Sequence, residues 1–167
     1  MKPILALLLL LAGPKQSGIR QLIDNNRVAV WEATSVTAVQ SKYDRVAIDL
    51  TKPGTAVFVR KGAAHSSPAH AILVDLKDVS VPPIPNKTGY PLAFPREGVK
   101  KVLENDRLIV WDYTWAAGKP TVMHFHDKDV VVVYLADGQL KSTTPDGKSE
   151  VNTISFGLTK FNAPNRS

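Results

Sequence analysis

Short runs of apolar and β-branched residues recur along most of the chain after residue 18. Segments such as RVAVWEATSV (27–36), HAILVDLKDV (70–79) and DVVVVYLA (129–136) are rich in Val, Ile, Thr and aromatic residues. Turn sequences such as KPG, ADG and PDG separate them, and no segment keeps a helical period. Runs of this kind, bounded by Gly, Pro and Asp, are typical of strands. The pattern therefore predicts an all-β protein.

The chain also contains an internal repeat. QLIDNNRVAVWEATSVTA (21–38) aligns without a gap with KVLENDRLIVWDYTWAAG (101–118). Each copy has an acid–Asn pair, an Arg, and an alternating apolar strand that ends in Trp and an acid. Such a specific string at a fixed offset indicates two copies of one β-unit. We expect Trp31 and Trp111, at matching positions of the repeat, to be packing residues.

The repeat and the prolines divide the chain into four parts. Residues 81–98 contain five of the twelve prolines, so they are unsuited to a sheet interior and are predicted to be a linker. We therefore expect an N-terminal apolar segment (1–18), a first repeat (19–80), the linker (81–98) and a second repeat (99–167). We also expect the linker to lie outside the two repeats, and each repeat to enclose its own interior.

The N-terminal segment bears on the compartment. Lys2 is followed by an apolar run from Ile4 to Ala12, a pattern that fits a secretory signal peptide and is too short to span a membrane. This predicts export to the periplasm or the extracellular space. A buried N-terminal strand is the alternative. The absence of cysteine excludes disulfides, thiolate metal sites and a lipid-anchored lipoprotein.

The net charge of +6 changes this picture little. Lys and Arg are scattered singly, and the longest basic block is VKKV at 99–102. A protein that follows a phosphate backbone gathers its positive charge on one surface. The distribution therefore argues against a nucleic-acid partner.

Two stretches resemble the paired sequence motifs of the cupin superfamily. The first cupin motif is Gly, five residues, His-x-His, three or four residues, Glu, six residues and Gly. The second repeat matches it with Gly118, KPTVM, His124-Phe125-His126, DKDV, Val131, VVYLAD and Gly138, so that only the Glu is replaced. The second motif is Gly, five residues, Pro-x-Gly, two residues and His. The first repeat matches it with Gly54, TAVFV, Arg60-Lys61-Gly62, AA and His65, with Arg60 in place of Pro.

The resemblance implies two tandem cupin-type β-barrel or jelly-roll units, as in a bicupin. Gly54 follows Trp31 by 23 residues, whereas Gly157 follows Trp111 by 46, so the first unit is expected to be reduced by a hairpin. The second unit is expected to be incomplete and C-terminally truncated, because the sequence stops just before the place of its second-motif histidine. A truncated unit would leave a sheet edge near residues 156–161, which predicts pairing with a second chain as a homodimer.

The resemblance also implies a metal site at His124 and His126. In metal-binding cupins the two first-motif histidines, the Glu and the second-motif histidine of the same barrel are the ligands. Histidines two apart on a strand point to one face, where both can reach one ion. Val131 supplies no donor; Asp129 replaces the lost carboxylate only if a bulge redirects it, and His65 joins only if the two repeats share a site. We therefore expect weak binding of a divalent Fe, Mn, Ni or Zn ion.

Two function classes follow from this set of residues. The first is an exported, non-catalytic cupin-type barrel that binds a small molecule of unknown identity. The alternative is a divalent-metal-dependent cupin enzyme of the oxygenase, isomerase or decarboxylase type, acting on a small molecule. A barrel fold hosts both, so the sequence leaves open whether the protein is an enzyme.

Overall fold

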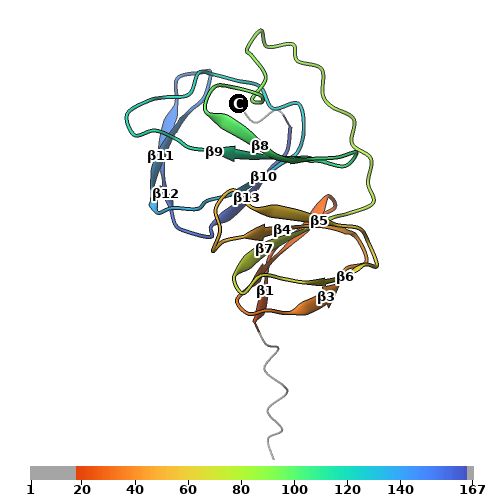
Figure 1. Ribbon diagram of the computed structural model, residues 1–167. Helices are drawn as coiled ribbons and strands as arrows, with labels where there is room; N and C mark the ends of the chain where they lie inside the picture. Colours follow the sequence, from red (N-terminus) through yellow and green to blue (C-terminus); the bar gives the residue numbers. More distant parts are fainter. Residues whose placement is uncertain (1–17, 165–167) are drawn as a thin grey trace, which may run out of the picture.

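The described part of the protein consists of strands and loops. The computed structural model describes residues 18–164, in which thirteen strands and no helix are present (Figure 1). This confirms the all-β prediction, and no helix of this part is long and apolar enough to cross a membrane. The predicted signal sequence lies outside the described residues.

The first half forms a five-stranded antiparallel sheet with a small hairpin on one side. The sheet order is β1-β2-β7-β4-β5. Its strands are β1 (Ile19–Asp24), β2 (Val28–Ala33), β7 (Ala71–Leu76), β4 (Asp44–Asp49) and β5 (Ala56–Val59), and the hairpin pairs β3 (Ala38–Gln40) with β6 (Ala64–Ser66). The central strand β7, AILVDL, is buried through its first five residues. An almost continuous apolar run suits a strand that is covered on both faces.

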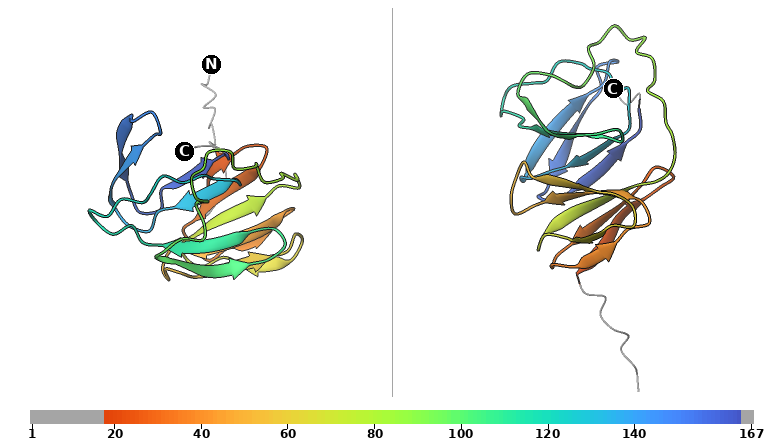
Figure 2. Two further views of the ribbon diagram at one scale, coloured as in Figure 1. Left: turned by 90° about the horizontal axis from the view of Figure 1, so that it is seen from above. Right: turned by 45° about the vertical axis from the view of Figure 1, so that its right-hand side comes forward.

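The second half is made of three separate two-stranded pairs. They are β8 (Val99–Glu104) with β9 (Ile109–Tyr113), β10 (Val130–Val133) with β13 (Thr159–Asn162), and β11 (Gly138–Thr143) with β12 (Ser149–Ile154). The hairpin of β11 and β12 stands to one side of the molecule (Figure 2). No sheet closes into a barrel within residues 18–164.

The sequence repeat is also a repeat of local structure. The β1–β2 and β8–β9 hairpins share one register, with a bulge between Gln21 and Ile23 in the first and between Lys101 and Leu103 in the second. In the first turn, the Asn25 side-chain oxygen accepts the backbone N–H groups of residues 27 and 28 at 2.8 and 2.9 Å. Asn105 does the same for residues 107 and 108 at 2.8 and 3.1 Å. The conserved acid–Asn string of the repeat thus encodes one turn, built twice.

The two halves differ in one hairpin, which the shorter first half lacks. In the first half, β4 pairs directly with β5 across a turn, so that Val46 lies opposite Phe58. In the second half, β10 pairs with β13 in the same register, with Val131 opposite Phe161, and the β11–β12 hairpin lies between them in the sequence. The hairpin expected to be absent from the first repeat is therefore this one.

The halves also differ at the centre of the sheet. In the first half, β7 lies between β2 and β4 and pairs with both. The corresponding strands of the second half are β9 and β10, and in the described part of the chain no strand lies between them. One edge of β9 and one edge of β10 consequently lack a partner strand there.

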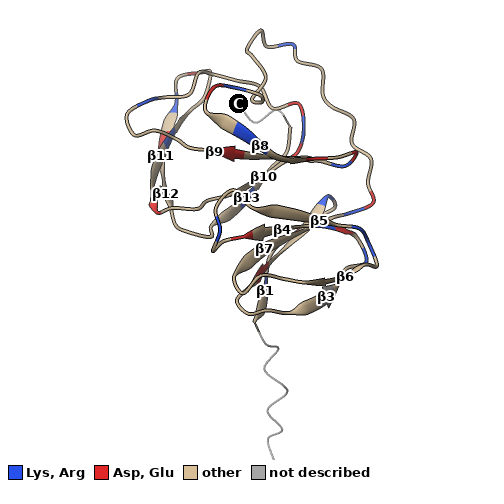
Figure 3. Cartoon of the chain, viewed as in Figure 1, with Lys and Arg blue, Asp and Glu red and all other residues tan. Residues whose placement is uncertain are grey.

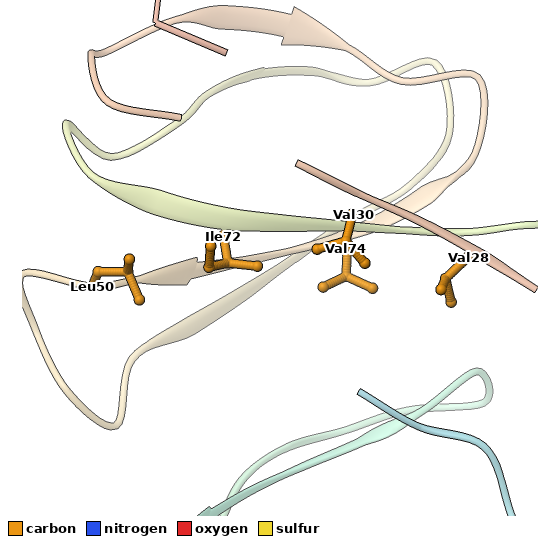
Figure 4. Packing of buried hydrophobic residues seen from close by; sticks show 5 residues of the cluster. All are labelled: Val28, Val30, Leu50, Ile72 and Val74. Atoms are coloured by element: carbon orange, nitrogen blue, oxygen red, sulfur yellow. The ribbon is translucent and has the colours of Figure 1, made fainter. Parts of the chain in front are cut away.

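The prediction of two separate interiors is wrong for one face of the first sheet, whereas the other face has a buried cluster within the first half. Val28, Val30, Leu50, Ile72 and Val74 form a buried cluster on one face of the five-stranded sheet, where they lie in a row (Figure 4). Four residues of the second half pack against this cluster, namely Val131, Val133, Leu135 and Phe161. Because β10 and β13 turn one apolar face toward the first sheet, the halves bury that surface against each other and share one core.

The expectation that residues 81–98 lie outside both repeats is also wrong in part. The segment runs along one side of the molecule from the first half to the second (Figure 1). There Ala93 is buried, and its N–H donates to the carbonyl of Phe125 at 2.9 Å. The N–H of Phe125 donates in turn to the carbonyl of Pro91 at 2.8 Å, which makes a short parallel bridge. Prolines keep the segment out of a sheet interior, but the N–H groups of Ala93 and Ile84 still pair with the second half.

Charged residues occur along the chain in both halves. Figure 3 shows Lys and Arg (blue) and Asp and Glu (red) at scattered places on strands and turns. This distribution agrees with the scattered charge of the sequence.

Candidate functional site

The two histidines of the sequence motif lie on the segment that precedes β10. Phe125, between them, is 2% exposed and pairs with the linker, while His124 and His126 are each partly exposed. Successive side chains of an extended segment point to opposite faces, so burial of Phe125 places both imidazoles on the other face.

The two imidazoles converge at their Nε2 atoms. These nitrogens lie 3.1 Å apart, with the ring centroids 4.9 Å apart and the planes at 71°. His124 Nδ1 lies 2.8 Å from the carbonyl oxygen of Val122, so Nδ1 carries the proton that it donates, and Nε2 is left with a lone pair. Two nitrogens bound to one ion at about 2.0–2.1 Å lie roughly 3 Å apart. The spacing is that of a hydrogen bond from the N–H of His126 Nε2 to His124 Nε2, and it also equals the separation of two ligands of one metal ion.

The other predicted ligands do not join this pair. No group of three or more His, Cys, Asp or Glu side chains suited to a metal occurs among residues 18–164. Val131 packs into the shared core, and Asp129 Oδ2 lies 3.5 Å from Arg27 Nε in an ion pair. Asp129 is thus turned toward the first half, and no bulge redirects it to the imidazoles.

His65 lies in the first half, on β6. Together with Ala38, Gln40, Ala64 and Ser66 it lines a cavity of about 360 Å³. Its Nε2 is buried and has no hydrogen-bond partner in the described part of the protein. The site shared between the repeats, with His65 as a third ligand, is therefore not formed.

Arg96 is the residue of this site that the sequence did not reveal. It follows the linker residues that bridge to Phe125, and one of its terminal nitrogens lies 3.5 Å from His124 Nδ1. Its guanidinium carbon lies 4.2 Å from the ring centroid of Tyr113 and 4.9 Å from that of Phe94. Such cation–π contacts hold the guanidinium in place. A lone Arg in a Pro-rich segment has no sequence pattern that could have identified it.

Arg96 has no acidic partner. Its Nε is buried without a hydrogen-bond partner, and no ion pair joins it to a carboxylate in the described residues. Burial lowers its pKa from the ordinary value, and only Tyr113 acts in the opposite direction. Burial likewise lowers the pKa of His126, as do the neighbouring His124 and Arg96, and Asp127 opposes them. The cluster therefore carries positive charge at Arg96, and Asp127 is the carboxylate whose charge acts on His126.

Aromatic side chains border this cluster. Tyr113 meets Trp115 edge to face at 4.9 Å between ring centroids, and Trp115 stacks on Tyr134 at 6.1 Å. Burial raises the pKa of the Tyr134 hydroxyl. Trp111 stacks on Phe94 at 5.8 Å, which agrees with its predicted packing role. Together, Tyr113, Trp115 and Tyr134 form an aromatic wall next to Arg96, which in turn lies beside His124.

In the corresponding region of the first half, the polar side chains hydrogen-bond to one another. Arg45 binds Asp75 through two hydrogen bonds of 2.6 and 3.0 Å, and both side chains are less than 10% exposed. Ser41 Oγ and Trp31 Nε1 also donate to the Asp75 carboxylate, at 2.8 and 3.1 Å. A cavity of about 190 Å³ remains next to Trp31 and Arg45. Each charge of this buried pair is satisfied by the other.

Comparison of the chain with protein-family models, with curated proteins and with solved structures found no match. The cupin resemblance consequently stays a prediction from the two sequence motifs.

Proposed function

We propose that this protein is a non-catalytic, cupin-type β-protein that binds a small molecule in its second half. The ligand site consists of His124, His126 and Arg96, bordered by the aromatic wall. The observation that carries the proposal is the convergence of three nitrogen-bearing side chains, from two separate segments, beside aromatic residues of which Trp115 is exposed. Polar groups that converge next to aromatic side chains are typical of small-molecule sites.

The electrostatics favour this function over metal-dependent catalysis. A metal enzyme of this type needs three or more protein ligands that hold the ion while open positions receive the substrate. Here the two imidazoles have no third ligand within the described residues, and a guanidinium lies 3.5 Å from one of them. A positive group at that distance repels a divalent cation. Weak metal binding is the consequence.

A divalent-metal enzyme of the oxygenase, isomerase or decarboxylase type is the second candidate. The 3.1 Å spacing of the Nε2 atoms favours it, and so does the hydrogen bond from His124 Nδ1 to the Val122 carbonyl. A backbone carbonyl that accepts the other ring N–H is the usual support of a metal-binding histidine. His124 and His126 would hold the ion, with Fe, Mn, Ni or Zn as the candidates, and the ion would supply Lewis-acid or redox chemistry.

Metal analysis and ligand binding together separate the two candidates. Dialysed wild-type protein and a His124→Ala/His126→Ala double variant are compared for bound metal and for binding of a small-molecule fragment set, followed by ¹H–¹⁵N NMR. A His65→Ala variant is the matched control, since His65 lines a different cavity. We expect less than stoichiometric metal in the wild type, and fragment-induced shifts around Arg96 and Tyr113 that the double variant loses. Stoichiometric metal in the wild type that the double variant lacks would instead establish the enzyme candidate.

Export and self-association belong to the same proposal. Export is supported by Lys2 and the apolar run from Ile4 to Ala12. Cell fractionation with N-terminal sequencing tests it, and recovery of the protein only in the cytoplasm, with Met1 intact, would contradict it. Homodimer formation is supported by the position of β13 at a sheet edge, because among residues 18–164 it pairs only with β10. Light scattering at high concentration tests this part of the proposal.

A further inference from the structure

The two halves of the repeat differ in the polar groups next to the matching tryptophans, Trp31 and Trp111. In the first half the carboxylate of Asp75, on β7, lies among Trp31, Ser41 and Arg45 and accepts a hydrogen bond from each. The carboxylate neutralises the buried guanidinium, and the other two donors satisfy its remaining lone pairs. An anion is therefore an integral part of this interior.

The repeat identifies the matching residues of the second half. Trp111 corresponds to Trp31 in the hairpin register. β4 and β5 pair in the same register as β10 and β13, and this register matches Asp44 with Asp129. Three residues before these positions, Ser41 of the first half matches His126 of the second half. Both positions again carry groups able to donate a hydrogen bond. The strand that would correspond to β7, and with it the carboxylate, has no counterpart among the described residues.

A guanidinium is nevertheless present in the second half. Arg96 comes from the linker rather than from the strand that carries Arg45, and it lies beside His124 and over the Tyr113 ring. Its buried Nε lacks a partner, and no carboxylate neutralises it in the described part of the chain. A buried donor without an acceptor destabilises the folded protein, and more strongly when the donor is charged. A ligand that supplies the missing anion removes this destabilisation.

We propose that the second half binds a small organic carboxylate, which Arg96 anchors in the way that Arg45 holds Asp75. This inference rests on the proposed function and names its ligand class. The planar guanidinium matches a carboxylate in a two-point hydrogen bond. The aromatic wall of Tyr113, Trp115 and Tyr134 receives an apolar or aromatic body attached to the carboxylate.

The test compares a charged probe with its neutral analogue on the full chain. Benzoate, benzamide, acetate and inorganic phosphate are titrated at neutral pH and constant ionic strength, with tryptophan fluorescence and ¹H–¹⁵N NMR as readouts. We expect saturable benzoate binding with shifts at Arg96 and Tyr113, and binding of benzamide weaker by about tenfold or more. Acetate lacks the ring and should bind more weakly than benzoate. If phosphate binds more tightly than benzoate, the proposed ligand class is wrong and the site takes phosphate groups instead of carboxylates.

Variants assign the effect to Arg96. Arg96→Gln should weaken benzoate binding by about tenfold or more, and Arg96→Lys, which keeps the charge but loses the two-point contact, by less. Arg20→Gln removes the same charge from an exposed position in the first half and should leave the affinity within about twofold. The comparison of benzoate with benzamide needs no variant, so it holds even if Arg96→Gln does not fold.

Each outcome decides a different claim. Equal binding of benzoate and benzamide at the same residues would overturn the carboxylate class and leave the proposed small-molecule site intact. If benzoate causes no shifts at these residues while other fragments do, the carboxylate class is likewise overturned and the small-molecule site stays intact. The proposed function itself fails only when the full fragment set produces no shifts around His124, His126 and Arg96.

Discussion

Arg27 Nε lies 3.5 Å from Asp129 Oδ2, and this ion pair joins the β1–β2 turn of the first half to the start of β10 in the second. The reciprocal pair is also present, since Arg107 Nη1 lies 3.6 Å from Asp44 Oδ2. Arg107 corresponds to Arg27 in the repeat, and Asp44 corresponds to Asp129. The two halves therefore meet through matching surfaces, as two subunits do in an isologous dimer.

The reciprocal ion pairs should couple the halves weakly. Arg27 and Asp129 are 27% and 24% exposed, so a double-mutant cycle with Arg27→Ala and Asp129→Ala should give a coupling free energy of about 0.2–1 kcal/mol. Urea unfolding followed by tryptophan fluorescence measures it. The exposed pair Lys148–Asp146 serves as a control, because both its residues lie on the same turn. A coupling of zero for the first pair would show that this ion pair does not help to join the halves.

The same symmetry explains an unpartnered oxygen at Asp129. In the first half, Asp44 Oδ1 accepts the backbone N–H of Lys61 at 3.0 Å. The β5 and β13 registers place Pro164 at the position of Lys61, and proline has no N–H. Asp129 Oδ1 is accordingly buried without a hydrogen bond.

Pro164→Ala should restore the missing donor. We expect the substitution to be more stabilising in the wild type than in an Asp129→Ala background, by about 0.5–1.5 kcal/mol. The change in unfolded-chain entropy caused by removing the proline is common to both backgrounds and cancels in the difference. Equal effects in the two backgrounds, measured by urea unfolding, would contradict this explanation.

The buried Asp75 should be among the most costly residues to replace. Asp75→Ala leaves Arg45, which is 6% exposed, without a counter-ion, and should destabilise the protein by about 3–5 kcal/mol. Asp146→Ala, which breaks an exposed ion pair, should change the free energy of unfolding by less than about 1 kcal/mol. A loss below about 1 kcal/mol for Asp75→Ala would show that water reaches the Arg45 side chain.

Hydrogen exchange should distinguish the central strands of the two halves. β2 pairs on both sides, with β1 and β7, whereas β9 pairs only with β8 in the described residues. Alternate amides of Ile109–Tyr113 should therefore exchange much faster than the matching amides of Ala29–Ala33, because their N–H groups lack an acceptor strand. Slow exchange along the whole of β9 would show that another segment or chain covers this edge.

His126 should make stability depend on pH in a defined direction. Its pKa is lowered, chiefly by burial, so the unfolded chain binds the proton more tightly than the folded one. The contribution of His126 is therefore complete above its unfolded value of about 6.5 and is lost as the pH falls below it. NMR titration of the imidazole should give a midpoint below 6.5, and Arg96→Gln should raise that midpoint by removing a nearby positive charge. A midpoint above 6.5 would contradict the burial of this side chain.

The sequence by itself determined the strands, the hairpins and the repeat. Alternating apolar runs and turn residues act over a few positions, and the side chains of Asn25 and Asn105 bind N–H groups only two and three residues further on. The His-x-His spacing likewise placed His124 and His126 on one face, because alternation along an extended segment is local. Features of this kind need no knowledge of the rest of the fold.

The tertiary structure alone decided the shared core and the composition of the site. Val131 and Phe161 can pack against any apolar surface, and the sequence does not state that this surface belongs to the other repeat. Arg96 reaches His124 only because Ala93 and Pro91 bridge to Phe125, a backbone pairing that leaves no mark on side-chain pattern. Which surfaces meet depends on the burial of whole sheets, so residues far apart in sequence are brought together by a free energy that no single segment encodes.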